Sequence, residues 1–268
     1  AIRDEQYLSI QWYNYSGDPI YSENSPSPTK DDSSYTKSTS RTDNYTASAF
    51  LTYNTKIGEN HDLTAMLGWQ YDRTEYEYTA TKAKNVDPAL GVLNGTGQVS
   101  INKVDKWKEA IMSYFGRVNY SYKSKYLLAA SLRADGSSVL AKGHKWGYFP
   151  SVAVAWRVSD ENFMESTRDW LDNLKLRASW GSTGNAGISA YQTLPMVNAD
   201  NQIYYEFGSG VTTGRIPTTL GNENLTWETT TSYNFGVDFG FWGNRIYGSA
   251  DFYINKTKDL LYAQSLPL

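Results

Sequence analysis

The sequence predicts an all-β chain, an antiparallel segment of a transmembrane β-barrel with short turns on one rim and long loops on the other. Three observations predict this fold class. Hydrophobic and polar residues alternate with a period of two through most of the 268 residues. Many alternating runs extend over roughly 9–15 residues, longer than the strands of soluble sheets and suited to a tilted membrane crossing. Aromatic residues collect at the ends of the apolar faces, as in the aromatic girdles of membrane barrels. These aromatic residues are Tyr114, Tyr122, Tyr126, Tyr148, Trp180, Trp227 and Phe241.

The alternation predicts about nine strands, and a tenth if residues 260–266 pair with a neighbour. In chain order they cover residues 8–12, 45–53, 63–71, 113–122, 126–135, 151–158, 174–181, 227–241 and 246–254. The clearest run is Ser113–Tyr122, whose two faces separate Tyr114, Gly116 and Val118 from Phe115, Arg117 and Asn119.

The connections between these strands alternate in length. Short turns are expected at residues 58–61, 123–125 and 243–244, and long loops at residues 16–41, 83–108, 136–146 and 182–225. The connection at residues 159–173 lies on the short side and is expected to contain a helical turn. In membrane barrels, short turns face the periplasm and long loops face the outside.

Composition excludes several classes of site. The chain has no cysteine, so disulfides, thiolate metal sites and a cysteine nucleophile are excluded. It has two histidines, His61 and His144, too few for a multi-histidine metal centre. The formal net charge of −3 gives no basic excess for nucleic acid. We therefore expect no cofactor, no metal and no catalytic residue, and hence no enzyme.

A series of short motifs follows in order along the chain. They are Ser113–Tyr120, Lys125–Leu128, Arg133–Ser138, Trp146–Ser151, Leu174–Gly181, Gly184–Asn185, Asn222–Glu228, Asn234–Asp238, Asp251–Tyr253 and Lys258–Leu261. In this order and spacing, across residues 41–263, the chain resembles the barrel of SusC/RagA-type TonB-dependent outer-membrane transporters.

The resemblance implies a Gram-negative outer-membrane location and uptake of oligosaccharides or, in some members, peptides. A SusD-like surface lipoprotein would act as the lid, and TonB would couple through an N-terminal region. Barrels of this class have about 22 strands, so the chain is expected to be an internal, partial barrel spanning residues 1–268. The family's plug domain and TonB box are expected to be absent from it.

On this interpretation, the polar strand face lines the barrel lumen, where it would hold the plug and guide substrate. The candidate lumen residues are Arg117, Asn119, Arg133, Asp135, Arg157, Lys175, Arg177, Glu228, Asp238, Arg245 and Asp251. The alternative is that these charges simply pair across strands, as inside any large barrel.

Loop aromatics are the second set of candidates. Tyr191, Tyr204, Tyr205 and Phe207 are expected either to contact a glycan or a partner protein, or to pack against their own loop.

Two other functions remain open at this point. A soluble, aromatic-rich β-sandwich that binds carbohydrate would also show alternating strands. A β-rich glycosidase has only scattered carboxylates in its favour, with no preferred pair.

Overall fold

The computed structural model describes residues 3–13, 34–84, 98–198, 204–208 and 210–262. The chain divides into two compact units, each described by itself below. The first comprises Ala1–Thr46 and Arg73–Glu109, and the second comprises Ala47–Asp72 and Ala110–Leu268.

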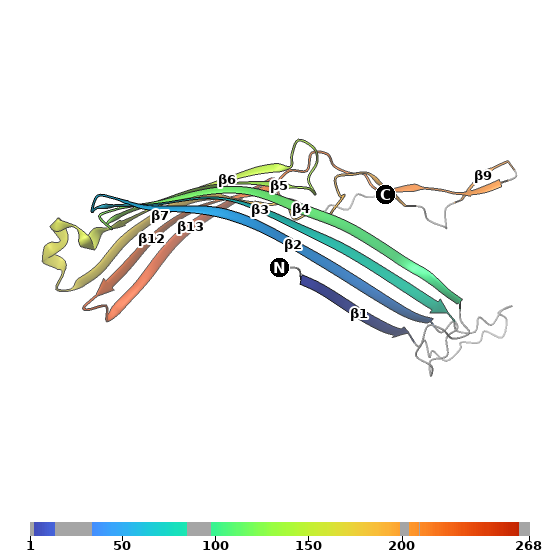
Figure 1. Cartoon of the computed structure of the whole chain (residues 1–268), viewed down its shortest axis with the longest axis horizontal. Helices are drawn as coiled ribbons and strands as arrows, with labels where there is room; N and C mark the ends of the chain where they lie inside the picture. The colour runs from blue at the N-terminus through green and yellow to red at the C-terminus, as the bar shows by residue number, and fades with distance from the viewer. Residues whose placement is uncertain (1–2, 14–33, 85–97, 199–203, 209, 263–268) are drawn as a thin grey trace. The chain divides into compact units, whose positions relative to one another are not determined.

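One nine-stranded sheet has the strand order β1-β2-β3-β4-β5-β6-β7-β12-β13. Its strands are β1 (Arg3–Tyr13), β2 (Ser34–Ile57), β3 (His61–Lys84), β4 (Gln98–Tyr122), β5 (Tyr126–Ser137), β6 (Trp146–Arg157), β7 (Leu171–Asn185), β12 (Glu228–Phe241) and β13 (Ile246–Lys258). Figure 1 shows β5, β6, β7, β12 and β13 side by side. The predicted antiparallel, all-β class is confirmed.

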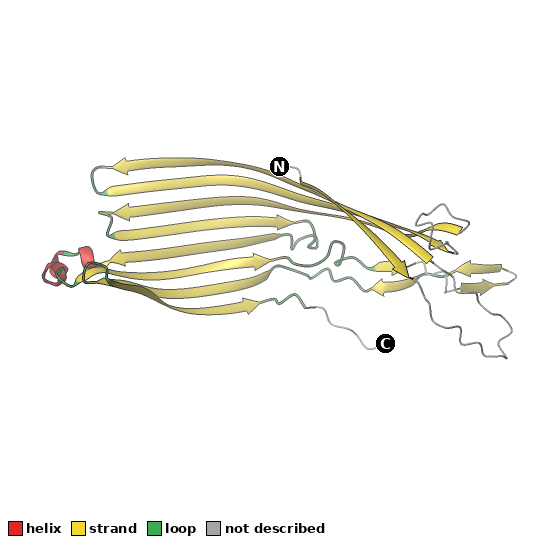
Figure 2. Ribbon diagram, turned by 90° about the horizontal axis from the view of Figure 1, so that it is seen from below, coloured by secondary structure: helices red, strands yellow, loops and turns green. Residues whose placement is uncertain are grey.

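The connections also follow the prediction on one rim. Two 3-10 helices, η1 (Val158–Asp160) and η2 (Asn162–Thr167), occupy the connection expected to contain a helical turn. Figure 2 shows them at the same end of the strands as the tight turns. Within the long connection from β7 to β12, β8 (Met196–Asn198) pairs with β11 (Ile216–Thr219), and β9 (Tyr204–Phe207) pairs with β10 (Gly210–Thr213).

Two predicted loop boundaries are wrong. Residues 34–41 and 98–108 belong to β2 and β4, strands of 24 and 25 residues. Polar residues predominate in these stretches, and apolar ones such as Ile101 and Val104 fall on opposite faces, so no continuous apolar alternation is present. In the first unit, cross-strand contacts support the paired strands: Lys108 pairs with Glu75 at 3.2 Å, and Trp107 stacks on Tyr76 at 5.2 Å. The possible tenth strand was predicted at residues 260–266: residues 260–262 form no strand, and the remainder lies outside the described residues.

In the second unit, one face of the sheet carries most of the large hydrophobic side chains. This apolar face includes Tyr148, Val154 and Phe235, and the exposed fractions of Tyr148 and Phe235 are 66% and 57%. A β-sandwich would bury these side chains against a second sheet. Instead, the long strands form one nine-stranded sheet and leave these side chains exposed, which is not the arrangement of a sandwich.

The buried hydrophobic cluster lies at the long-loop end of the sheet. It consists of Val139, Leu140, Phe149 and Trp227, with Ala186, Ile188, Ala190 and Leu225 packed against it. The Phe149 and Trp227 rings meet edge-on at 5.3 Å, and Trp227 Nε1 donates to the Lys145 carbonyl oxygen at 2.9 Å. Trp227 was predicted for the aromatic girdle, and this is wrong: it precedes β12 and is buried in this loop core.

Gly184 on β7 leaves the space that the Phe149 ring fills. A Cβ atom at Gly184 would lie 2.0 Å from Phe149 Cζ, and one at Gly147 would lie 2.5 Å from the same atom. Real carbon atoms do not approach this closely, so the ring and the two glycines require one another.

We predict that Gly184→Val destabilises the full-length barrel by about 1–3 kcal/mol, because the new side chain displaces the Phe149 ring. Thermal loss of the heat-sensitive, folded band on gel electrophoresis measures the effect. Thr183→Val, at the exposed neighbouring position, is the control. In the double variant with Phe149→Ala, the two losses should be clearly less than additive. Full additivity would contradict this packing.

Candidate functional site

The polar face of the second unit is floored by small side chains in two neighbouring cross-strand rows. The first row runs Arg117, Ser131, Ser151, Gly181, Ser232 and Asn255, and the second runs Asn119, Ala129, Ala153, Ser179, Asn234 and Tyr253. Two hollows of about 680 and 440 Å³ lie along these rows. The hydroxyl oxygens of Ser131 and Ser151 are 2.7 Å apart and hydrogen bonded.

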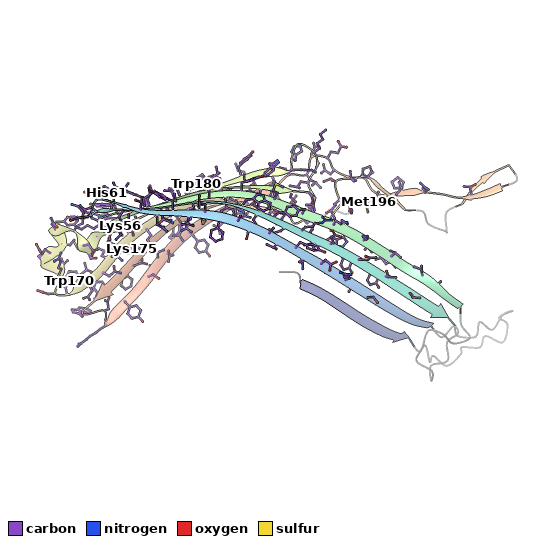
Figure 3. All side chains as sticks on the ribbon, in the orientation of Figure 1. Lys56, His61, Trp170, Lys175, Trp180 and Met196 are labelled. Atoms are coloured by element: carbon purple, nitrogen blue, oxygen red, sulfur yellow. The ribbon has the colours of Figure 1, made fainter. Side chains whose placement is uncertain are left out.

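Charged side chains from β7, β12 and β13 gather at the short-turn side of this floor. The Arg177 guanidinium donates to Asp238 through Nε at 3.0 and 3.1 Å and through a terminal nitrogen at 2.8 Å. It also reaches Asp251 at 3.2 Å, and Lys175 Nζ lies 3.8 Å from Asp238. Figure 3 labels Lys175 on this part of β7, with Trp180 farther along the strand. Two cations and two carboxylates therefore compensate one another across three strands.

Gly236 makes this cluster possible. It stands directly opposite Arg177 on β7 and opposite Asp251 on β13. A Cβ atom there would lie 2.6 Å from an Asp251 carboxylate oxygen and 2.8 Å from the Arg177 guanidinium carbon. The ion pair crosses β12 through the space that glycine leaves.

A second charged group lies at the other side of the floor. Arg133 Nε donates to both oxygens of Asp135, at 2.7 and 2.9 Å, and a terminal nitrogen donates to Ser113 Oγ at 2.8 Å. Its guanidinium lies 5.6 Å from the centre of the Phe115 ring. A Cβ at Gly68 would lie 2.3 Å from Phe115 Cζ, so that ring covers the β3 backbone. Ser113 is fully buried beneath this group.

The remaining lumen candidates belong to neither of these two charged groups. Arg117 Nε donates to Asn119 at 3.1 Å, and Arg157 approaches Asp160 at 3.8 Å. Glu228 accepts from the backbone of Leu261 at 3.1 Å and from the Asn185 amide at 3.4 Å. Arg245 is exposed in the turn between β12 and β13.

The loop candidates are less well defined by the structure. Tyr191 lies in the connection between β7 and β8, with an exposed side chain and a φ of +67°. The backbones of Tyr204, Tyr205 and Phe207 form β9, but their side chains lie outside the described residues. Their contact with a substrate or partner stays a prediction.

Sequence reasoning missed four residues that shape this face: Ser113, Phe115, Phe149 and Gly184. Phe115 and Phe149 are aromatic residues at positions that the alternation assigns to the polar face. A large ring on the polar face, together with glycines in the same motifs, could have indicated that the ring packs over a glycine.

The floor offers hydroxyl and amide groups and guanidinium ions for hydrogen bonding. In the part of the chain that the structure describes, no three His, Cys, Asp or Glu side chains are grouped to hold a metal ion. No helix among those residues has the length and hydropathy to cross a membrane.

Comparisons with known proteins agree with the β-barrel fold class. Residues 3–268 match the family described as TonB dependent receptor-like, beta-barrel. The TonB-dependent receptor SusC of Bacteroides thetaiotaomicron is 43% identical over 164 residues, which are 60% of this chain and 16% of that protein. TonB-dependent receptor P26 of Formosa agariphila is 35% identical over 228 residues, 81% of this chain and 22% of that protein.

Among solved structures, the RagAB peptide transporter superposes with a TM-score of 0.79 at 25% identity, covering 99% of this chain and 28% of that chain. The resemblance to SusC/RagA-type transporters is thereby confirmed. The chain spans about a fifth of the length of the curated receptors that it matches.

We predict that Asp238→Asn loosens the charged cluster, because Arg177 then keeps only the Asp251 carboxylate and Lys175 loses the carboxylate that it approaches. The expected loss is about 1 kcal/mol of unfolding free energy, reduced at high salt, since the side chains are part-exposed. Thermal unfolding of the full-length barrel at low and high salt measures it. Asp62→Asn, at a weaker and more exposed ion pair with Lys56, is the control. An equal effect at both positions would contradict the cluster's role.

Proposed function

Because the chain belongs to the family of TonB-dependent receptor-like β-barrels, we propose that it forms part of the wall of an outer-membrane transporter that imports oligosaccharides. The observation that carries this proposal is the division of one sheet into an exposed apolar face and a polar face floored by small side chains. Barrel strands that cross a membrane direct one face to lipid and the other to the lumen.

The chemistry of the polar floor supports a hydroxyl-rich substrate. Ser131 and Ser151 present hydroxyls, and Asn119 and Asn234 present amides, along rows that leave about 680 and 440 Å³ of space. These groups both donate and accept hydrogen bonds, as sugar hydroxyls require. Peptide is the second candidate, favoured by the superposition on the RagAB peptide transporter.

The proposed assembly has two partners outside this chain. A SusD-like surface lipoprotein would close the long-loop side, where Tyr191 is exposed. TonB would engage a segment of the full-length protein other than this one, and its pull would open the path along the polar face. On this proposal the chain performs no catalysis.

Deleting the parent gene tests the substrate. We predict that the deletion strain loses growth on one class of oligosaccharide as sole carbon source and retains growth on its constituent monosaccharide. A plasmid copy of the full-length gene restores growth, and dissipating the proton-motive force stops uptake. Loss confined to peptide growth would favour the peptide alternative. Normal growth on every substrate would contradict both.

A pair of adjacent substitutions tests which face meets lipid. Val154→Arg places a charge on the apolar face and should cost about 2–4 kcal/mol near the membrane midplane, which reduces the folded protein in the outer-membrane fraction. Ala153→Arg, one residue away, points into the polar floor and should be tolerated. Equal tolerance of both, or the reverse order, would contradict the proposed orientation.

A further inference from the structure

The connection between β6 and β7 differs from two of the other short turns of its rim. The turns at Gly58–Asn60 and Lys123–Lys125 contain no aromatic residue, whereas residues 158–170 contain Phe163 and Trp170. The exposed fractions of these two side chains are 64% and 46%, and that of neighbouring Trp242 is 55%. Figure 3 labels Trp170 at this end of the strands. Three large rings in or beside this connection are therefore exposed.

The start of this connection is hydrogen bonded to side chains of the apolar face and of the adjoining turn. The Glu161 carboxylate accepts hydrogen bonds from Trp156 Nε1 at 3.1 Å and Lys125 Nζ at 3.4 Å, and from the Tyr126 hydroxyl. These bonds, that of Tyr126 first, hold the pKa of Glu161 below its usual value. Phe163 then packs edge-on against Trp156, at 6.4 Å.

Trp156 belongs to a row of rings on the apolar face. Tyr122, Tyr126 and Trp156 stand opposite one another on β4, β5 and β6. The ring centres of neighbours in this row are 6.1 and 6.4 Å apart, and the rings are stacked. Phe163 extends the row beyond the end of the strands.

The end of the connection returns to the same face. Trp170 stacks on Phe241 of β12 at 6.0 Å with an interplanar angle of 8°. Its carbonyl oxygen accepts a hydrogen bond of 3.0 Å from the Trp242 backbone nitrogen. Both ends of the connection are thus held against rings of the apolar face, which leaves Phe163, Trp170 and Trp242 directed to the surroundings.

We propose that residues 158–170 form an interfacial foot, which lies in the headgroup region of the membrane leaflet on the short-turn side and does not project into water. Amphipathic rings concentrate at this depth because their apolar bodies and polar tips are both satisfied there. The foot continues the apolar face, so a bilayer that covers Trp156 and Phe241 also reaches Phe163 and Trp170. This inference rests on the proposed membrane function.

The charge of the foot indicates which lipid it meets. Residues 158–170 contain one basic residue, Arg168, against four acidic ones, Asp160, Glu161, Glu165 and Asp169. A net negative segment gains nothing from anionic lipids, unlike a basic amphipathic helix. The foot is therefore expected to insert through its rings into a bilayer of zwitterionic phospholipid, with little dependence on salt.

Environment-sensitive labels on the full-length transporter test the foot. A fluorophore is attached at Phe163→Cys in a cysteine-free background and the protein is reconstituted into phosphatidylcholine vesicles. We expect blue-shifted emission, several-fold stronger quenching by headgroup-linked nitroxide lipid than by aqueous iodide, and no change at high salt. Glu59→Cys, in a turn without rings, should show the opposite pattern. If position 163 behaves like position 59, the foot does not exist.

A further labelled variant separates failure of the foot from failure of the membrane function. Val154→Cys reports the apolar face itself. Lipid quenching at 154 without quenching at 163 overturns the foot alone, whereas no lipid quenching at either overturns the proposed membrane function. A label at 163 shielded from both quenchers is covered by protein, which also overturns the foot.

Glu161→Ala should reduce lipid quenching at position 163 several-fold while the barrel remains folded, because the fastening to Trp156 and Lys125 is lost. Glu165→Ala, in the same segment with a side chain that is 73% exposed, is the matched control and should leave quenching unchanged. An unchanged signal in Glu161→Ala would show that the carboxylate does not hold the foot and would overturn that part of the inference.

Discussion

The residue-for-residue register of the antiparallel ladder is the constraint on which the rest of the structure depends. From β4 to β13 in the second unit, the residue pairings continue without a slip except at one irregularity between Gly240 and Phe241. One apolar row therefore crosses six strands at a constant level: Tyr120, Leu128, Val154, Ala178, Phe235 and Phe252. Because side chains alternate with a period of two, a slip of one residue would exchange the two faces of a strand. The apolar and polar faces stay separate only if no strand slips in this way.

Glycines beside large side chains are the second requirement, and each has a definite partner. Gly68 lies beneath the Phe115 ring, Gly184 beneath Phe149, and Gly236 beneath the ion pair of Arg177. In all three cases a large group on one strand occupies the space that a side chain on the next strand would fill. Such pairs fix the register as well as the packing, since a shifted strand would bring a Cβ atom into the ring or guanidinium.

Sequence alone predicted the parts of this fold in which one face is apolar. Strands β5, β6, β7 and β12 alternate clearly, and their faces are as expected. The same method failed where polar residues interrupt the apolar pattern: residues 34–41 and 98–108 lack a continuous apolar face, yet they continue β2 and β4. A mainly polar sequence does not distinguish a strand from a loop unless its cross-strand partner is known.

The candidate site was likewise predictable from the sequence only in part. Alternation placed Arg177, Asp238 and Asp251 on the polar face, but it could not show that they meet, because 61 and 74 residues of chain separate Arg177 from its partners. It also assigned Trp227 to the girdle, since an aromatic residue beside a strand resembles a girdle residue in sequence. The folding of three loops over Phe149, which buries Trp227, depends on long-range packing that no local pattern records.

The central claim is that the two faces of this sheet meet different environments in the full-length protein. Spin labels placed in turn at Ser232, Tyr233, Asn234 and Phe235 of β12, in the transporter reconstituted into bilayers, measure it most directly. The account predicts that collisions with oxygen dissolved in lipid alternate along the strand, high at 233 and 235 and low at 232 and 234. Low oxygen accessibility at all four positions would mean that protein covers both faces, and it would contradict the account.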